Sequence, residues 1–79
     1  MDVEVIMPRL GQEMTQGTIV EWYKKEGEQV EQGEPLFQVE TEKATMDVEA
    51  EVSGTLKQIL VDVDKEVPVG QVVAILTKS

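Results

Sequence analysis

Residues 46–52 read Met46-Asp47-Val48-Glu49-Ala50-Glu51-Val52, and this stretch decides the fold class. Apolar side chains alternate with acidic ones at every position. A β-strand points successive side chains to opposite faces, so a period of two gives one buried face and one face in water. The stretch therefore predicts a half-buried β-strand.

The segments on both sides of this stretch also favour strands. Residues 3–7 alternate in the same way, although Ile6 interrupts the pattern. A helix between residues 20 and 39 is disfavoured, because Pro35 alone costs about 3 kcal/mol in a helix interior. Four further segments are rich in apolar and β-branched residues, and we expect each to be a strand: Thr18–Tyr23, Leu36–Thr41, Thr55–Val61 and Gln71–Thr77. The chain is therefore predicted to be all-β.

The sequence repeats itself after a shift of 37 positions. Gly17-Thr18-Ile19 aligns with Gly54-Thr55-Leu56, and Gly33 aligns with Gly70. We expect these glycines at turns, where a positive φ or a close backbone approach is needed. The repeat predicts two similar halves packed with pseudo-two-fold symmetry. With short strands at regular spacing, it indicates a flattened β-barrel or sandwich of two small antiparallel sheets.

A tight hairpin is predicted where the strand before Thr41 meets the strand that begins at Met46. Neither Glu42 nor Lys43 favours the positive φ that a type I′ turn needs. A type I turn over residues 41–44 accepts ordinary residues at both central positions. In that turn the Lys43 side chain points away from the sheet into solvent.

Lys43 is the candidate functional residue at this tip. Its stem is long and flexible, and its amine is open to acylation. Neither burial nor a cationic neighbour tunes it as a nucleophile. Most surface lysines only interact with water and have no further function. The position nevertheless suits an amine that another enzyme modifies.

The composition excludes several classes of function. The 79 residues include no Cys and no His, so disulfides, Cys/His zinc sites and His-based nucleophile systems are excluded. We expect no catalytic residue and no metal site. Sixteen acidic residues against seven basic ones disfavour nucleic acid and anionic membranes, and suit a basic partner surface. No apolar run is long enough to span a membrane.

The run Glu40-Thr41-Glu42-Lys43-Ala44 resembles the lipoylation motif of lipoyl domains from 2-oxoacid dehydrogenase complexes. In that motif an acidic residue and an alanine flank the modified lysine. The commonest family form has Asp directly before the lysine, and Glu42 keeps its charge. Three more segments resemble the family's opening strand and its turns: Met7-Pro8-x-Leu10-Gly11, Gly27-Glu28-x-Val30-x-x-Gly33-Glu34-x-Leu36 and Ser53-Gly54. The resemblance covers residues 1–79 as one lipoyl domain.

The resemblance implies a fold and a role. The fold would be two four-stranded antiparallel sheets related by a pseudo-two-fold axis, the lipoyl/biotinyl-carrier fold. Lipoate would be joined to Lys43 by an amide bond, and the reactive chemistry would belong to that cofactor. The domain would be a non-catalytic, swinging-arm acyl and electron carrier of a dihydrolipoamide acyltransferase. It would be reductively acylated by the 2-oxoacid decarboxylase, would deliver the acyl group to coenzyme A, and would be reoxidised by dihydrolipoamide dehydrogenase.

The resemblance also implies partners: a lipoate-protein ligase, the decarboxylase, the acyltransferase core and dihydrolipoamide dehydrogenase. In lipoyl domains the loop after the first strand lies close to the lysine hairpin. The predicted recognition residues are therefore Gly11, Gln12, Glu13 and Met14 in that loop, with Glu40, Thr41, Glu42 and Ala44 in the hairpin. Alternatively, Met14 caps the core and Glu13 is only solvated. We expect a monomer from a cytoplasmic protein, or from the mitochondrial matrix if the parent is eukaryotic.

Three alternatives remain open at the sequence level. A biotin carrier domain of a carboxylase resembles the same fold, but methionines normally flank its lysine, and here Glu42 and Ala44 do. The glycine-cleavage carrier protein also bears lipoyl-lysine, on a longer domain. A purely structural hairpin of a membrane-fusion or adaptor protein needs no modifiable lysine. The sequence does not separate pyruvate, 2-oxoglutarate and branched-chain complexes.

Overall fold

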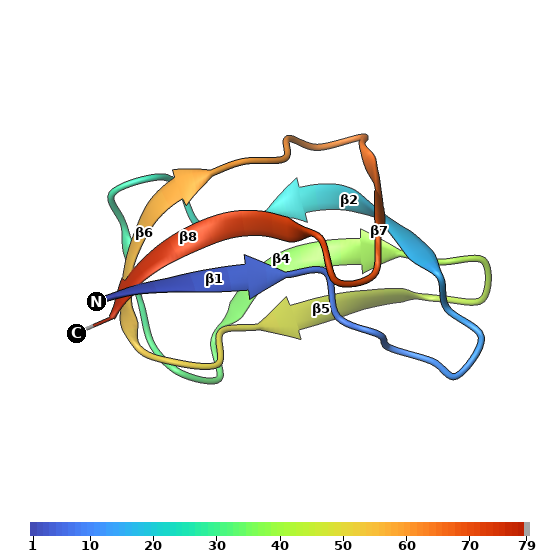
Figure 1. Ribbon diagram of the computed structural model, residues 1–79, viewed down its shortest axis with the longest axis horizontal. Coiled ribbons are helices and arrows are strands. Elements are labelled where there is room, and N and C mark those ends of the chain that lie inside the picture. The colour runs from blue at the N-terminus through green and yellow to red at the C-terminus, as the bar shows by residue number, and fades with distance from the viewer. Residues whose placement is uncertain (79) are drawn as a thin grey trace.

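The computed structural model describes residues 1–78, which form two four-stranded antiparallel sheets (Figure 1). The sheets have the strand orders β1-β8-β6-β3 and β5-β4-β2-β7. Their eight strands are β1 (Asp2–Ile6), β2 (Gln16–Trp22), β3 (Gln29–Val30), β4 (Pro35–Glu40), β5 (Thr45–Glu49), β6 (Gly54–Ile59), β7 (Glu66–Pro68) and β8 (Val72–Lys78). The predicted fold class is confirmed. Within residues 1–78, no helix is long and apolar enough to cross a membrane.

The pseudo-two-fold arrangement follows from how the two halves exchange strands. A shift of 37 positions carries β2, β3 and β4 approximately onto β6, β7 and β8. The central strands β8 and β6 of one sheet come from the second half, and its edge strands β1 and β3 come from the first. In the other sheet β4 and β2 are central, and β5 and β7 are the edges. Each half therefore completes its sheet with edge strands of the other.

The core between the sheets is apolar. Phe37, Ile19, Leu36 and Leu56 are fully buried, and no buried polar or charged side chain occurs in the described part of the chain. Phe37 also packs against Trp22, with ring centroids 4.8 Å apart and ring planes tilted by 40°. Such buried apolar side chains each contribute roughly 1.5–3 kcal/mol relative to an exposed position. This shared apolar core holds the two sheets together beneath the β4–β5 hairpin.

Side-chain alternation holds in β5 and β1, the two strands that were predicted from an alternating sequence pattern. Met46 and Val48 of β5 are half-buried, and the acidic residues between and after them are exposed. In β1, Ile6 is 47% exposed and Met7 beyond it is fully buried. Ile6 therefore faces outward between the half-buried Val5 and the buried Met7, and the pairing of β1 with β8 shifts register between Val5 and Ile6.

The predicted strand over residues 46–52 is shorter in the structure. β5 ends at Glu49, because the chain then bonds to the turn before β4. The Ala50 N–H donates to the Glu34 carbonyl at 2.9 Å, and the Ala50 carbonyl accepts from the Gly33 N–H at 2.9 Å. Ala50 is buried, so the alternation of buried and exposed side chains continues past the end of β5.

Two of the four repeat glycines lie in strands and not in turns. Gly33 and Gly70 have φ of 89° and 94° and lie in turns, as predicted. Gly17 is in β2, and a Cβ there would come within 2.6 Å of Val39 Cγ1. Gly54 is in β6, where a Cβ would meet the Thr77 carbonyl. The expected turn positions are wrong for this pair, and close packing is the reason for glycine at both.

The long axis of the molecule separates the chain ends from the β4–β5 hairpin. The N-terminus and the end of β8 lie at one side, and the hairpin and the β1–β2 loop lie at the other (Figure 1). The Lys78 N–H donates to the Met1 carbonyl at 2.8 Å, and Lys57 Nζ lies 2.8 Å from Asp2 Oδ2. The hydrogen bond from Lys57 lowers the pKa of Asp2 below its ordinary value of 3.8. The extents are 34 × 20 × 18 Å, so the hairpin tip lies far from the termini.

Candidate functional site

The hairpin tip that carries Lys43 is short and closed at its base. Glu40 pairs with Thr45 in the ladder between β4 and β5. One step further, the Thr41 N–H donates to the Ala44 carbonyl at 2.8 Å. The tip is then Glu42-Lys43, as predicted. Within residues 1–78 the one positive φ at a non-glycine residue is at Asp64, so a type I′ turn is absent from this tip.

The Thr41 side chain closes the turn from inside. Its hydroxyl donates to the Ala44 carbonyl at 3.0 Å. The same oxygen accepts from the N–H of Ala44 at 3.2 Å and from the N–H of Lys43 at 3.4 Å. Threonine hydroxyls form such local bonds to backbone groups in turns. The sequence predicted the place of the turn, but gave no sign that a side chain closes it.

The Lys43 amine is open to solvent. Its side chain is 83% exposed, and its Nζ lies 3.8 Å from Oε2 of Glu13, which is itself 88% exposed. An exposed pair of this kind contributes at most about 1 kcal/mol. An amine that another protein is to acylate must be reachable and free of a buried counter-charge. Lys43 meets both conditions, so it fits covalent attachment of a carboxylic-acid cofactor.

The loop between β1 and β2 reaches the hairpin through Glu13 and is held by Met14. Gly11, Gln12 and Glu13 are exposed. Met14 is 9% exposed and belongs to the core, and its Sδ accepts the N–H of Leu10 at 3.2 Å. Met14 therefore caps this end of the core, which was the alternative for this residue. A recognition role for all four residues stays a prediction.

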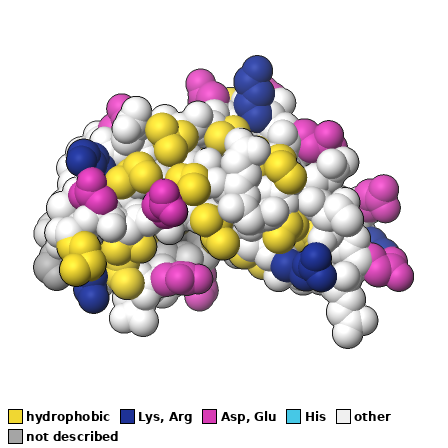
Figure 2. Space-filling model, viewed as in Figure 1, with side chains coloured by type: hydrophobic (Ala, Val, Ile, Leu, Met, Phe, Trp, Pro, Cys, Tyr) yellow, Lys and Arg dark blue, Asp and Glu magenta, His cyan; other side chains and the backbone are white. Residues whose placement is uncertain are grey.

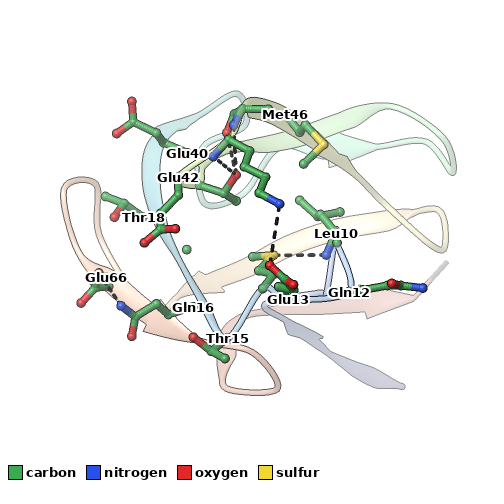
Figure 3. A pocket seen from close by; sticks show the side chains of 16 residues that line it. Leu10, Gln12, Glu13, Thr15, Gln16, Thr18, Glu40, Glu42, Met46 and Glu66 are labelled. Carbon is green, nitrogen blue, oxygen red and sulfur yellow. Dashed lines mark hydrogen bonds and ion pairs between the residues drawn. The ribbon is translucent and has the colours of Figure 1, made fainter.

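A groove of about 530 Å³ lies between this loop and the hairpin (Figure 3). Lys43 and all eight predicted recognition residues line it: Gly11, Gln12, Glu13, Met14, Glu40, Thr41, Glu42 and Ala44. Segments that are about thirty positions apart in the sequence thus form one surface. The sequence reasoning missed Met46 and Glu66, which also line the groove. Gln16 Nε2 donates to Glu66 Oε2 at 2.9 Å, and Glu66 was missed because β7 was not predicted as a strand.

The groove has a negative charge. Four carboxylates line it, together with the single ammonium of Lys43: Glu13, Glu40, Glu42 and Glu66. Acidic side chains also appear at the hairpin end of the space-filling view, beside a basic one (Figure 2). In the described chain these carboxylates do not gather into a group of three or more that could hold a metal ion. The charge thus favours basic partner surfaces over bound cations.

Comparison with known proteins places the chain beside carriers of covalent cofactors. The biotin/lipoyl family model, described as "Biotin-requiring enzyme", matches residues 3–76. The dihydrolipoyllysine-residue acetyltransferase component of the pyruvate dehydrogenase complex of Rickettsia conorii is 40% identical over 80 residues, which is all of this chain and 19% of that protein. The succinyltransferase component of the 2-oxoglutarate dehydrogenase complex of Rickettsia bellii is 42% identical over 71 residues, 90% of this chain and 18% of that protein. The chain thus spans about a fifth of the length of these relatives.

A solved structure shares the whole fold. The lipoyl domain of the 2-oxoglutarate dehydrogenase complex from Azotobacter vinelandii superposes with a TM-score of 0.73 and is 31% identical. The match covers 98% of this chain and 95% of that domain. The likeness is therefore between two whole domains of similar size, and it includes the lysine hairpin.

Proposed function

Because this chain belongs to the biotin/lipoyl family, we propose that Lys43 carries lipoate through an amide bond to its Nζ. Residues 1–79 then make up one lipoyl domain of a dihydrolipoamide acyltransferase in a 2-oxoacid dehydrogenase complex. The relatives support this reading, since both are acyltransferase components of such complexes. One acts in a pyruvate complex and one in a 2-oxoglutarate complex, at 40% and 42% identity, so they favour the class without selecting one 2-oxoacid.

The observation that carries the proposal is the position of the Lys43 amine. The Lys43 side chain is 83% exposed, at the tip of a two-residue hairpin whose base is closed by backbone and side-chain bonds. Attached lipoate supplies a dithiolane that accepts acyl groups and electrons. The chain itself presents and supports the amine. The two-sheet body keeps the tip at the opposite end from the N-terminus and the end of β8 (Figure 1).

The groove beside Lys43 supports the proposed partners. A lipoate-protein ligase must grasp the tip, and the decarboxylase, the acyltransferase core and dihydrolipoamide dehydrogenase must each accept the arm that it carries. Glu13, Glu40 and Glu42 are exposed and line the same groove as Lys43, and Glu13 lies 3.8 Å from its amine. Complementary charge speeds encounter and rejects wrong partners more than it adds affinity. These three carboxylates are therefore the groups that we assign to partner recognition.

Biotin is the second candidate cofactor, because the family model includes domains of biotin-requiring enzymes. The residues beside the lysine disfavour it. Biotin carrier domains resemble this chain in fold, but methionines normally flank their lysine, and Lys43 lies between Glu42 and Ala44. Met46 lines the groove three positions further on, at the start of β5. The likeness to a whole lipoyl domain also favours lipoate.

The experiment incubates the domain with a lipoate-protein ligase or a biotin ligase and measures intact mass. Wild type is expected to gain one lipoyl group and no biotin. Lys43→Arg keeps the charge at the exposed tip and is expected to fold but to gain nothing. Lys65→Arg changes another exposed lysine and serves as the matched control that keeps the gain. A biotin gain without a lipoyl gain, or a lipoyl gain in Lys43→Arg, would overturn the proposal.

A further inference from the structure

We propose that Thr41 is a positioning residue, whose hydroxyl fixes the backbone of the hairpin tip so that Lys43 meets the modifying enzyme in one direction. This inference deepens the proposed function and rests on it. It gives Thr41 a different role from the partner contact that the sequence predicted.

The hydroxyl of Thr41 uses all of its bonding capacity inside the turn. A hydroxyl has one donor and two acceptor lone pairs. The donor goes to the Ala44 carbonyl at 3.0 Å, and the acceptors take the N–H groups of Ala44 at 3.2 Å and Lys43 at 3.4 Å. No capacity is left for a hydrogen bond to a partner. Its contribution therefore acts through the backbone of the residue that is modified.

The side chain of Lys43 cannot orient itself. Its one ion pair within residues 1–78 is the exposed contact with Glu13 at 3.8 Å, which is too weak to hold a flexible stem. Direction must come from the backbone on which the stem is mounted. The last backbone bond of the ladder joins the Thr41 N–H to the Ala44 carbonyl, so residues 42–43 extend beyond it. The hydroxyl continues the bonding into this tip.

Threonine suits this place for two reasons. Its β-branch restricts rotation about χ1, so the oxygen stays under the turn with little loss of entropy. Its half-buried side chain also packs at the base of the hairpin. Valine has nearly the same shape without the hydroxyl, and serine keeps the hydroxyl without the branch. The two variants separate the hydrogen bonds from the packing.

The first arm of the test measures amide hydrogen exchange of the unmodified domain. One hydrogen bond of about 1 kcal/mol corresponds to roughly a fivefold change in an opening equilibrium. In Thr41→Val the amides of Lys43 and Ala44 are expected to exchange about fivefold faster or more, and amides of the central strands at the wild-type rate. Thr41→Ser is expected to stay within about twofold of wild type, because it keeps the same oxygen.

The second arm measures modification by the lipoate-protein ligase. A misplaced acceptor reacts more slowly once bound, so kcat is expected to fall about tenfold in Thr41→Val. KM for the domain is expected to change by less than about twofold, and Thr41→Ser is expected to restore kcat. A residue that only contacted the ligase would change KM instead. A residue that only stabilised the fold would leave kcat of the folded domain unchanged.

The proposal is overturned if Thr41→Val exchanges these two amides at the wild-type rate, if its kcat is unchanged, or if Thr41→Ser fails like Thr41→Val. A wild-type domain that the ligase does not modify contradicts the proposed function instead. In that event the exchange arm, which needs no modification, still decides whether the hydroxyl fixes the tip.

Discussion

Replacing Met14 by alanine tests whether this residue anchors the β1–β2 loop to the core or instead contacts a partner protein. Met14 is 9% exposed and packs in the same core as Met7 and Val39. Its Sδ also accepts the N–H of Leu10 at 3.2 Å. The exposed residues before it in the loop depend on this anchor for their place beside Lys43.

The expected cost follows from burial. Replacing a buried Met by Ala costs about 2–5 kcal/mol, depending on how far the site can collapse. Met14 lies in a loop at the edge of the core, which can relax, so we expect about 2 kcal/mol. For a domain of this size, 1 kcal/mol corresponds to about 4–8 °C in Tm, so the Tm should fall by about 8–16 °C. Met14→Leu conserves volume and should cost less than about 1.5 kcal/mol.

The assay is thermal unfolding by circular dichroism, combined with modification by the ligase well below the Tm of each variant. Gln12→Ala, two positions away on the exposed side of the loop, is the matched control and should change stability by less than about 0.5 kcal/mol. The core assignment of Met14 is refuted if Met14→Ala keeps the wild-type Tm and loses modification. That result would make Met14 a contact residue, as the sequence first predicted.

Two further predictions concern the body of the domain. Gly54→Ala should lower the free energy of unfolding by about 3 kcal/mol in chemical denaturation, because the added Cβ meets the Thr77 carbonyl, a backbone group that cannot move aside. The control is Gly11→Ala, where an added Cβ meets nothing within 4 Å and stability should change by less than about 0.5 kcal/mol. Equal stability of the two variants would contradict the close packing of Gly54 against β8. An ultraviolet titration should place the pKa of Tyr23 at about 12, above its ordinary value of 10.0, because its hydroxyl donates to Asp47 Oδ1 at 2.7 Å. Since the folded pKa is the higher one, this bond should stabilise the fold fully below pH 10.0 and be lost as pH rises through about 12, and Asp47→Asn should return the midpoint towards 10.0.

The sequence predicted the elements whose side chains alternate or cluster, because burial on one face is encoded residue by residue. It missed β3 and β7, which have two and three residues and too few side chains to show a period. These two strands are defined by pairing with longer strands, since Val30 pairs with Gly54 of β6 and Val67 pairs with Gly17 of β2. The repeat aligns Val30 with Val67 and could have located both.

The lysine at the tip could be predicted because a hairpin is local and its residues are consecutive. Its surroundings could be predicted only by resemblance to a family. Glu13 lies next to Lys43 through the packing of Met14 and the pairing of β2 with β4, which no short-range pattern contains. Glu66 joins the groove from β7 for the same reason. The closing role of the Thr41 hydroxyl depends on a side-chain rotamer, which the sequence does not specify.

The most direct test of the central claim is acyl transfer to the ligase-treated domain, followed by intact mass. Purified decarboxylase components for pyruvate, 2-oxoglutarate and branched-chain 2-oxoacids are each supplied with their substrate. The account predicts that one of them adds its acyl mass to the wild-type domain, and that Lys43→Arg, with an unchanged Tm, gains none. Acyl transfer that persists in Lys43→Arg would contradict it.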